Sequence, residues 1–132
     1  MNRQQYYKYL FFIAAIWNWG MGVVFTLLTI FLRPTALTTF GAEDPPSLVW
    51  MHGFFFLIFV IGFAFFFASF DVKNNLAVVK FGIIDKFLIF PVMLIYFLLG
   101  DIGFAAIIPT IIDIIFAILF LECFLNIKRE SK

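Results

Sequence analysis

The residues of this sequence that could do chemistry are a few polar side chains set in long apolar stretches. The central ones are Asn18, Asp85, Lys86 and Asp113, each near the middle of a stretch that is otherwise almost entirely apolar. A charged side chain in the middle of a membrane-spanning helix costs at least about 2.5 kcal/mol on insertion scales. Such residues therefore need either partners or a function.

Depth along the apolar stretches predicts which of these residues meet. Lys86 and Asp113 lie at similar depths on consecutive antiparallel helices, and pairing them would offset two costly charges. Asn18 lies at the same level, so we expect it within hydrogen-bonding reach of at least one of them. Two interpretations stay open: the group only fixes the register of the helices, or it is a functional polar site for a proton or a ligand.

Asp85 has no evident partner. It is adjacent to Lys86 in the sequence and hence about 100° away around a helix, so the two side chains cannot comfortably share one partner. We expect Asp85 to be protonated, to face a different helix, or to meet a neighbouring protein.

Three further polar residues lie nearer the ends of the apolar stretches. His52 lies about one helical turn from the outer surface, where it is either a packing residue or a proton-gating residue at the outer mouth. Lys80 and Glu122 lie toward the inner edge. An ion pair between Lys80 and Glu122 is possible, but it cannot form well together with the pair of Lys86 and Asp113. On two straight helices, the spacing of the residues turns the two pairs to different faces.

No catalytic residue, metal site or cofactor is expected. The only cysteine, Cys123, excludes an internal disulfide and a Cys-x-x-Cys redox pair. A single histidine excludes a bis-histidine haem or a multi-histidine metal site within one chain. The net charge of +1, with no basic stripe among stacking aromatic residues, gives no reason to expect nucleic acid as a partner.

Four apolar stretches must position these residues. Of the 132 residues, 64% are hydrophobic and 13% are charged, so the lipid bilayer must cover part of the surface. A membrane span needs about 20 mostly apolar residues. Stretches of that length occupy residues 9–32, 48–70, 75–99 and 102–127. We predict an all-α, integral membrane four-helix bundle that forms a single domain over residues 1–132.

The basic residues predict the orientation of the chain in the membrane. Those that flank the spans on the side of both termini are Arg3, Lys8, Lys73, Lys128, Arg129 and Lys132. On the other side, Arg33 is the only basic residue, and it lies with Glu43, Asp44 and Asp101. Basic loops stay in the cytoplasm, so both termini and the connection at residues 71–74 are predicted inside. Short connections favour an up-down-up-down order.

Spaced residues on three of the four spans carry a resemblance to a known family. They are Asp71-x3-Asn75-x6-Gly82-x3-Lys86, with His52 and the pair Trp17-Asn18. The pattern resembles a family of small bacterial four-helix membrane proteins that is broadly DoxX-like in size and layout. The chain departs from it at Val72, where the family often has proline, and in the additional charge of Asp85. The resemblance implies a helical bundle in the bacterial inner membrane and implies no reaction.

Two functions from different classes stay open. The first and favoured one is a non-enzymatic subunit or accessory factor that binds itself or another membrane protein in a membrane assembly. The second is a small transporter or hydrophobic-ligand-binding bundle, in which the four central polar residues line a midplane site and His52 lies at its entrance. A cavity beside Asp85, Lys86 and Asp113 that opens to one side would favour the second function. A polar group sealed by side chains would favour the first.

Overall fold

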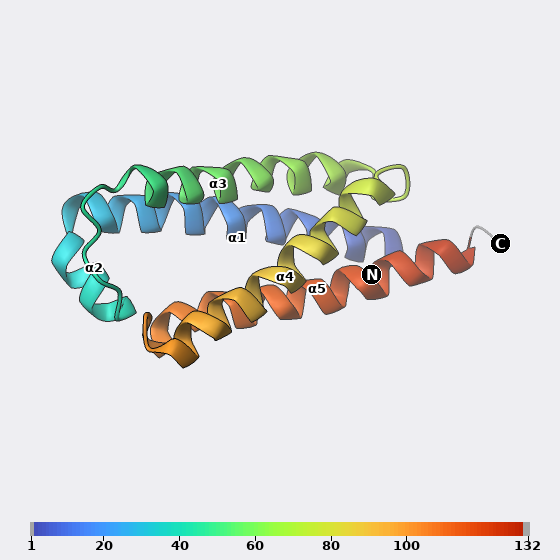
Figure 1. Ribbon diagram of the computed structural model, residues 1–132. Coiled ribbons are helices and arrows are strands. Elements are labelled where there is room, and N and C mark those ends of the chain that lie inside the picture. The colour runs from blue at the N-terminus through green and yellow to red at the C-terminus, as the bar shows by residue number, and fades with distance from the viewer. Residues whose placement is uncertain (1, 131–132) are drawn as a thin grey trace.

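The computed structural model in Figure 1 describes residues 2–130, which form α-helices and their connections. The helices are α1 (Arg3–Phe31), α2 (Arg33–Phe40), α3 (Val49–Phe70), α4 (Leu76–Leu99) and α5 (Phe104–Glu130). All except α2 are long and apolar enough to cross a membrane. The predictions of an all-α fold and of four membrane-length helices are therefore confirmed. Lys132, counted above among the basic residues, lies outside the described residues.

The helices extend beyond the predicted spans where polar residues support another turn. Residue 9 was the predicted start of the first span, whereas α1 begins at Arg3. Asn2 caps this end, because its side chain accepts hydrogen bonds from the backbone N–H groups of Gln4 and Gln5. At the other end of the chain, α5 continues to Glu130 rather than ending at residue 127.

The segment between α1 and α3 contains a helix that the sequence analysis did not predict. The predicted first span ends at residue 32, but a second helix, α2, begins at Arg33, since the proline that follows fits the first turn of a helix. Gly41 ends α2 with a φ of 59°, a conformation that favours glycine. The backbone N–H of Gly103 donates to the carbonyl of Phe40 at 2.7 Å, which joins the end of α2 to the start of α5.

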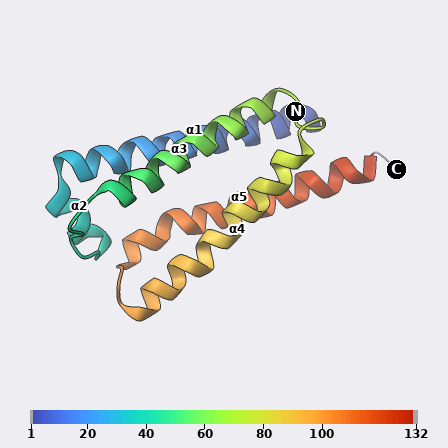
Figure 2. The ribbon, with the colours of Figure 1, turned by 45° about the horizontal axis from the view of Figure 1, so that its top comes forward.

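The four long helices form two antiparallel pairs rather than an evenly packed bundle (Figures 1 and 2). One pair consists of α1 and α3, and the other consists of α4 and α5. The first turn of α1, the last turn of α5 and the turn between α3 and α4 lie at the same end of the molecule. The pairs meet there and separate toward the opposite end, where α2 lies between α1 and α5.

Aromatic rings hold the pairs together at the end where they meet. Phe11 on α1, Phe65 on α3 and Phe120 on α5 are fully buried. The ring centroids of Phe11 and Phe120 are 4.4 Å apart, and Phe65 lies 6.0 Å and 5.3 Å from them. Gly82 brings α4 into this cluster, because a Cβ atom there would lie only 2.8 Å from the Phe65 ring and 2.9 Å from the Phe120 ring.

Candidate functional site

Lys86 joins all four long helices one turn beyond Gly82 on α4. Its side chain is 3% exposed, and its Nζ donates to Asp113 Oδ1 on α5 at 2.7 Å. The same Nζ donates to Asn18 Oδ1 on α1 at 2.6 Å. Asn18 Nδ2 in turn donates to the carbonyl of Ile58 on α3 at 3.3 Å. The structure thus brings together the three residues that the depth argument predicted to meet.

Asp113 has a further partner that the sequence analysis missed. Trp17 Nε1 donates to Asp113 Oδ1 at 3.1 Å, so this oxygen accepts two hydrogen bonds. An indole N–H in an apolar span needs an acceptor, and Trp17 lies next to Asn18 in the sequence. That need was the signal from which the contact could have been found.

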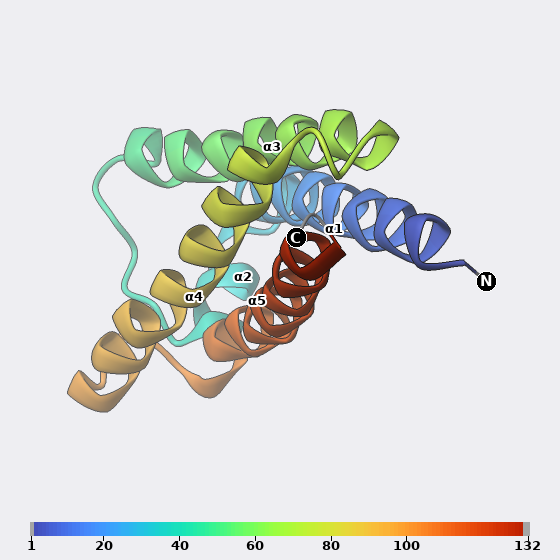
Figure 3. The same ribbon diagram turned by 90° about the vertical axis from the view of Figure 1, so that its right-hand side faces the viewer.

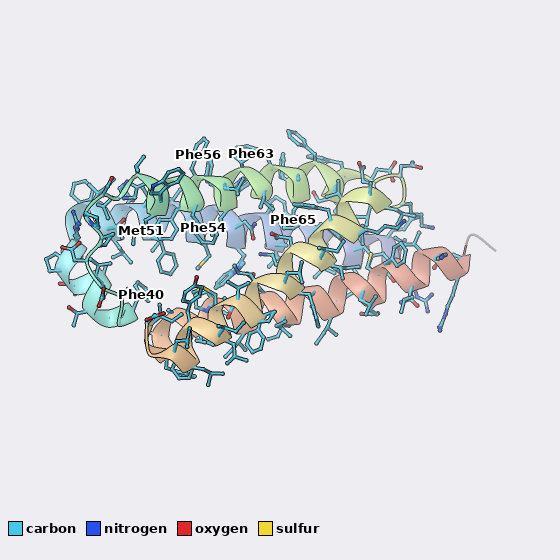
Figure 4. The ribbon with its side chains drawn as sticks, viewed as in Figure 1. Phe40, Met51, Phe54, Phe56, Phe63 and Phe65 are labelled. Carbon is cyan, nitrogen blue, oxygen red and sulfur yellow. The ribbon has the colours of Figure 1, made fainter. Side chains whose placement is uncertain are left out.

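A cavity of about 530 Å³ lies between the two helix pairs. The cavity begins at the level of Lys86 and extends toward the end of the molecule that holds α2. Each of the five helices contributes residues to its lining. The polar lining residues are Asn18, Thr29, Asp85, Lys86, Thr110 and Asp113, and most of the others are apolar. Figure 4 shows Phe40, Met51 and Phe54 on the cavity side, whereas Phe56 and Phe63 lie on the outer side of α3.

The cavity is closed on one side and open on the other. On the closed side, the lining residues Asn18 and Thr29 of α1, Leu37 of α2 and Thr110 of α5 are buried. On the open side, the lining residues Phe54, Leu57, Leu88 and Val92 are between 45% and 57% exposed. These four residues, the mouth residues, belong to α3 and α4, so the opening lies between these two helices. Figure 3 shows how α3 and α4 are arranged.

Asp85 lies on the face of α4 that lines this cavity. It shares the face with Leu88, Ile89 and Val92, which follow at spacings of three, four and seven residues. Asp85 is half-buried, and within residues 2–130 no hydrogen bond or ion pair involves its carboxyl group. The side chain therefore lines the space between the pairs rather than pairing with a different helix, and its protonation or contact with a neighbouring protein stays a prediction.

His52 does not line the cavity but lies behind it, on the first turn of α3. Its Nε2 is 3.0 Å from Thr29 Oγ1, and Thr29 Oγ1 also lies 2.9 Å from the carbonyl of Phe25. Whichever of the two groups donates, the hydrogen bond between Thr29 Oγ1 and His52 Nε2 joins α3 to α1. This geometry agrees with the packing interpretation of His52.

Lys80 and Glu122 do not form an ion pair with each other within the described part of the chain. Both side chains are exposed. Lys80 Nζ lies 5.4 Å from the centre of the Phe124 ring, and Glu122 accepts a hydrogen bond from Asn126 at 3.3 Å. Neither residue lines the cavity, so the candidate site does not include them.

Neither a metal site nor a known relative explains the cavity. Among residues 2–130, no three histidine, cysteine, aspartate or glutamate side chains are grouped so that they could hold a metal ion. No family model matches the chain, and no curated protein or solved structure is significantly similar to it. The function therefore has to be argued from the geometry of the site.

Proposed function

We propose that this polytopic membrane protein binds a lipophilic small molecule in the cavity between its helix pairs. The supporting observation is the cavity itself, whose volume of about 530 Å³ lies within the range of small-molecule sites, about 300–1,000 Å³. Such sites are mostly apolar and carry a few polar groups that orient the ligand. A ligand with an apolar body and one polar end fits this distribution, with its polar end beside Asp85 and Asp113.

The proposed membrane orientation gives the ligand a route. We place both termini and residues 71–74 in the cytoplasm, because most basic residues lie at that end. The cavity then lies in the outer half of the bilayer, and its mouth between α3 and α4 faces lipid. A molecule dissolved in the bilayer can enter without crossing water. We also propose that the chain forms a single four-span domain and that it is related to the DoxX-like family of the bacterial inner membrane. The spaced residues quoted above support this relationship.

The Asn18–Lys86–Asp113 group has two roles in this proposal. It stabilises the fold, because its hydrogen bonds join α1, α3, α4 and α5. It also forms the polar end of the cavity, because all three side chains line it. The structural and functional interpretations of the group therefore do not exclude each other.

A neutral fluorescent probe tests the proposed binding. Trp17 lines the cavity, so a variant with Trp19→Phe and Trp50→Phe has its single tryptophan at the site. We expect saturable energy transfer from Trp17 to 1-pyrenemethanol in nanodiscs, at one probe per chain. Ala106→Phe fills the cavity and should weaken binding at least about tenfold, since a bulky ring competes with the probe for space.

The matched control for this experiment is Ile108→Phe. Ile108 is 47% exposed on the same helix and does not line the cavity, so this variant should bind like the parent. Energy transfer that rises linearly with probe concentration would show simple partition into lipid. That result, or equal binding in the two phenylalanine variants, would contradict the proposed function.

A second candidate is a subunit or accessory factor that packs against another membrane protein or a second copy of the chain. The observation that favours it is the exposed, apolar character of the mouth residues, which a helix of a partner could cover. A photo-reactive amino acid placed at Leu88 distinguishes the candidates, because Leu88 is 57% exposed at the mouth. A lipid-facing mouth predicts photo-cross-links to lipid in cells. Cross-links to a second protein chain would favour the subunit.

A further inference from the structure

The cavity holds one acidic side chain without a counter-ion, and we infer that its ligand is a lipophilic cation, such as an amine, whose charged group binds Asp85. This inference rests on the proposed function and specifies the chemical class of the ligand. Three charged side chains line the cavity: Asp85, Lys86 and Asp113. Lys86 and Asp113 form an ion pair at 2.7 Å and offset each other. The carboxyl group of Asp85 is left without such a pair, and a cationic ligand would provide one.

A carboxylate beside an apolar cavity is costly unless a cation or hydrogen-bond donors accompany it. Within residues 2–130, neither a cation nor a hydrogen-bond donor contacts the Asp85 carboxyl group. The neighbouring Lys86 acts on Asp85 only from beyond ion-pair distance, because its ammonium group is held by Asp113 and Asn18 and is 3% exposed. A bound cation would supply the missing counter-ion.

An anionic ligand fits the same site poorly. It would bring a further negative charge beside Asp85 and Asp113. The only basic side chain lining the cavity is Lys86, whose Nζ lies 2.6 Å and 2.7 Å from two oxygen acceptors. The ammonium group has one N–H left beyond these two hydrogen bonds, but an anion that reached it would lie beside the carboxylate of Asp113. The charge of the site thus favours a cation over an anion.

The location of Asp85 also fits a ligand that enters from lipid. Asp85 shares its helix face with two of the mouth residues, Leu88 and Val92, which are about half exposed. A molecule passing between α3 and α4 therefore meets Asp85 without disturbing the buried Lys86. Aromatic rings among the lining residues can bind the apolar body and attract the cationic group through their faces. They are Trp17, Phe25, Phe40, Phe54 and Phe55.

Three pyrene compounds that differ in their polar group test the inference. They are 1-pyrenemethylamine, 1-pyrenemethanol and 1-pyrenecarboxylate, measured by energy transfer from Trp17 in nanodiscs of zwitterionic lipid. We expect the amine to bind at least about tenfold more tightly than the alcohol, and the carboxylate to bind most weakly. In Asp85→Asn, the ratio of amine to alcohol affinity should fall to about one. Glu122→Gln removes an acidic group of α5 outside the cavity and should keep the preference.

The outcomes separate this inference from the proposed function. Saturable binding of the alcohol without a preference for the amine would overturn the inference alone. A preference for the amine that persists in Asp85→Asn would overturn it as well. If none of the three compounds binds saturably, both the proposed function and the inference are wrong. Loss of the preference in Asp85→Asn but not in Glu122→Gln supports both.

Discussion

Replacing Lys86 with methionine removes the side chain that joins the four long helices. The change breaks the ion pair with Asp113 at 2.7 Å and the hydrogen bond to Asn18 at 2.6 Å. Removing one member of a buried pair costs about 3–5 kcal/mol, because the other charge stays buried without compensation. Asp113 is 17% exposed beside the cavity and keeps its hydrogen bond from Trp17. We therefore expect a cost near the lower limit, about 3 kcal/mol.

Asp113→Leu should cost more than Lys86→Met, near the upper limit of about 5 kcal/mol. The reason is burial: the Lys86 side chain is 3% exposed and would keep only Asn18 as an acceptor. The double variant leaves an apolar pair, which the interior of a membrane protein tolerates. Its loss of stability should be smaller than that of either single variant, which gives a coupling free energy of at least about 5 kcal/mol.

Thermal unfolding of the purified variants in mild detergent measures this cycle. A loss of 1 kcal/mol in stability lowers the Tm of a chain of this size by roughly 4 °C. The single variants should therefore lower the Tm by about 10–20 °C, and the double variant by less. Lys80→Met and Glu122→Leu provide the control on the same two helices, because within residues 2–130 these two residues do not pair with each other and their effects should add. If the effects of Lys86→Met and Asp113→Leu also simply add, the two residues are not coupled and the reasoning is wrong.

Two further predictions concern topology and packing. Reporters fused to the C-terminus and inserted at residues 71–74 should be active in the cytoplasm, and a reporter near Glu43 should be active outside; a cytoplasmic Glu43 would reverse the orientation. Gly82→Ala should destabilise the protein by about 1–3 kcal/mol in thermal unfolding, because the added Cβ atom would meet the Phe65 and Phe120 rings at 2.8 Å and 2.9 Å. Gly20→Ala is its control, since nothing lies within 4 Å of the added atom, and equal losses at the two positions would contradict the packing argument.

The polar contacts were predictable because charge is costly in a membrane and short connections fix the depth of consecutive helices. Those two facts place Lys86 and Asp113 at one level, and the structure brings them to 2.7 Å. The same reasoning identified Asp85 as lacking a partner. It could not place Asp85 at a cavity, because a residue's angle around a helix says nothing of what lies opposite until the packing is known.

The cavity was not predictable, because lipid and the interior of a membrane protein are both apolar. Phe54 lines the cavity and Phe56 lies on the outer side of α3, although they are the same residue type two positions apart. In a soluble protein, a helix has polar residues on its outer face, and these show which face is buried. Helix α3 has no such polar face. The short helix α2 was missed for another reason: proline at Pro34 starts a helix as readily as it ends one.

The most direct test of the proposed binding in the cavity is to map where a lipophilic molecule contacts the chain. A long-chain alcohol carrying an aliphatic diazirine can be photolysed with the protein in nanodiscs, and the modified residues identified by mass spectrometry. Binding in the cavity predicts modification of cavity residues such as Met21, Met51 and Met93, and suppression of this modification by 1-pyrenemethanol. Modification spread equally over outward-facing residues such as Phe56 and Phe63, without suppression, would show that the molecule only coats the lipid-facing surface and would contradict the account.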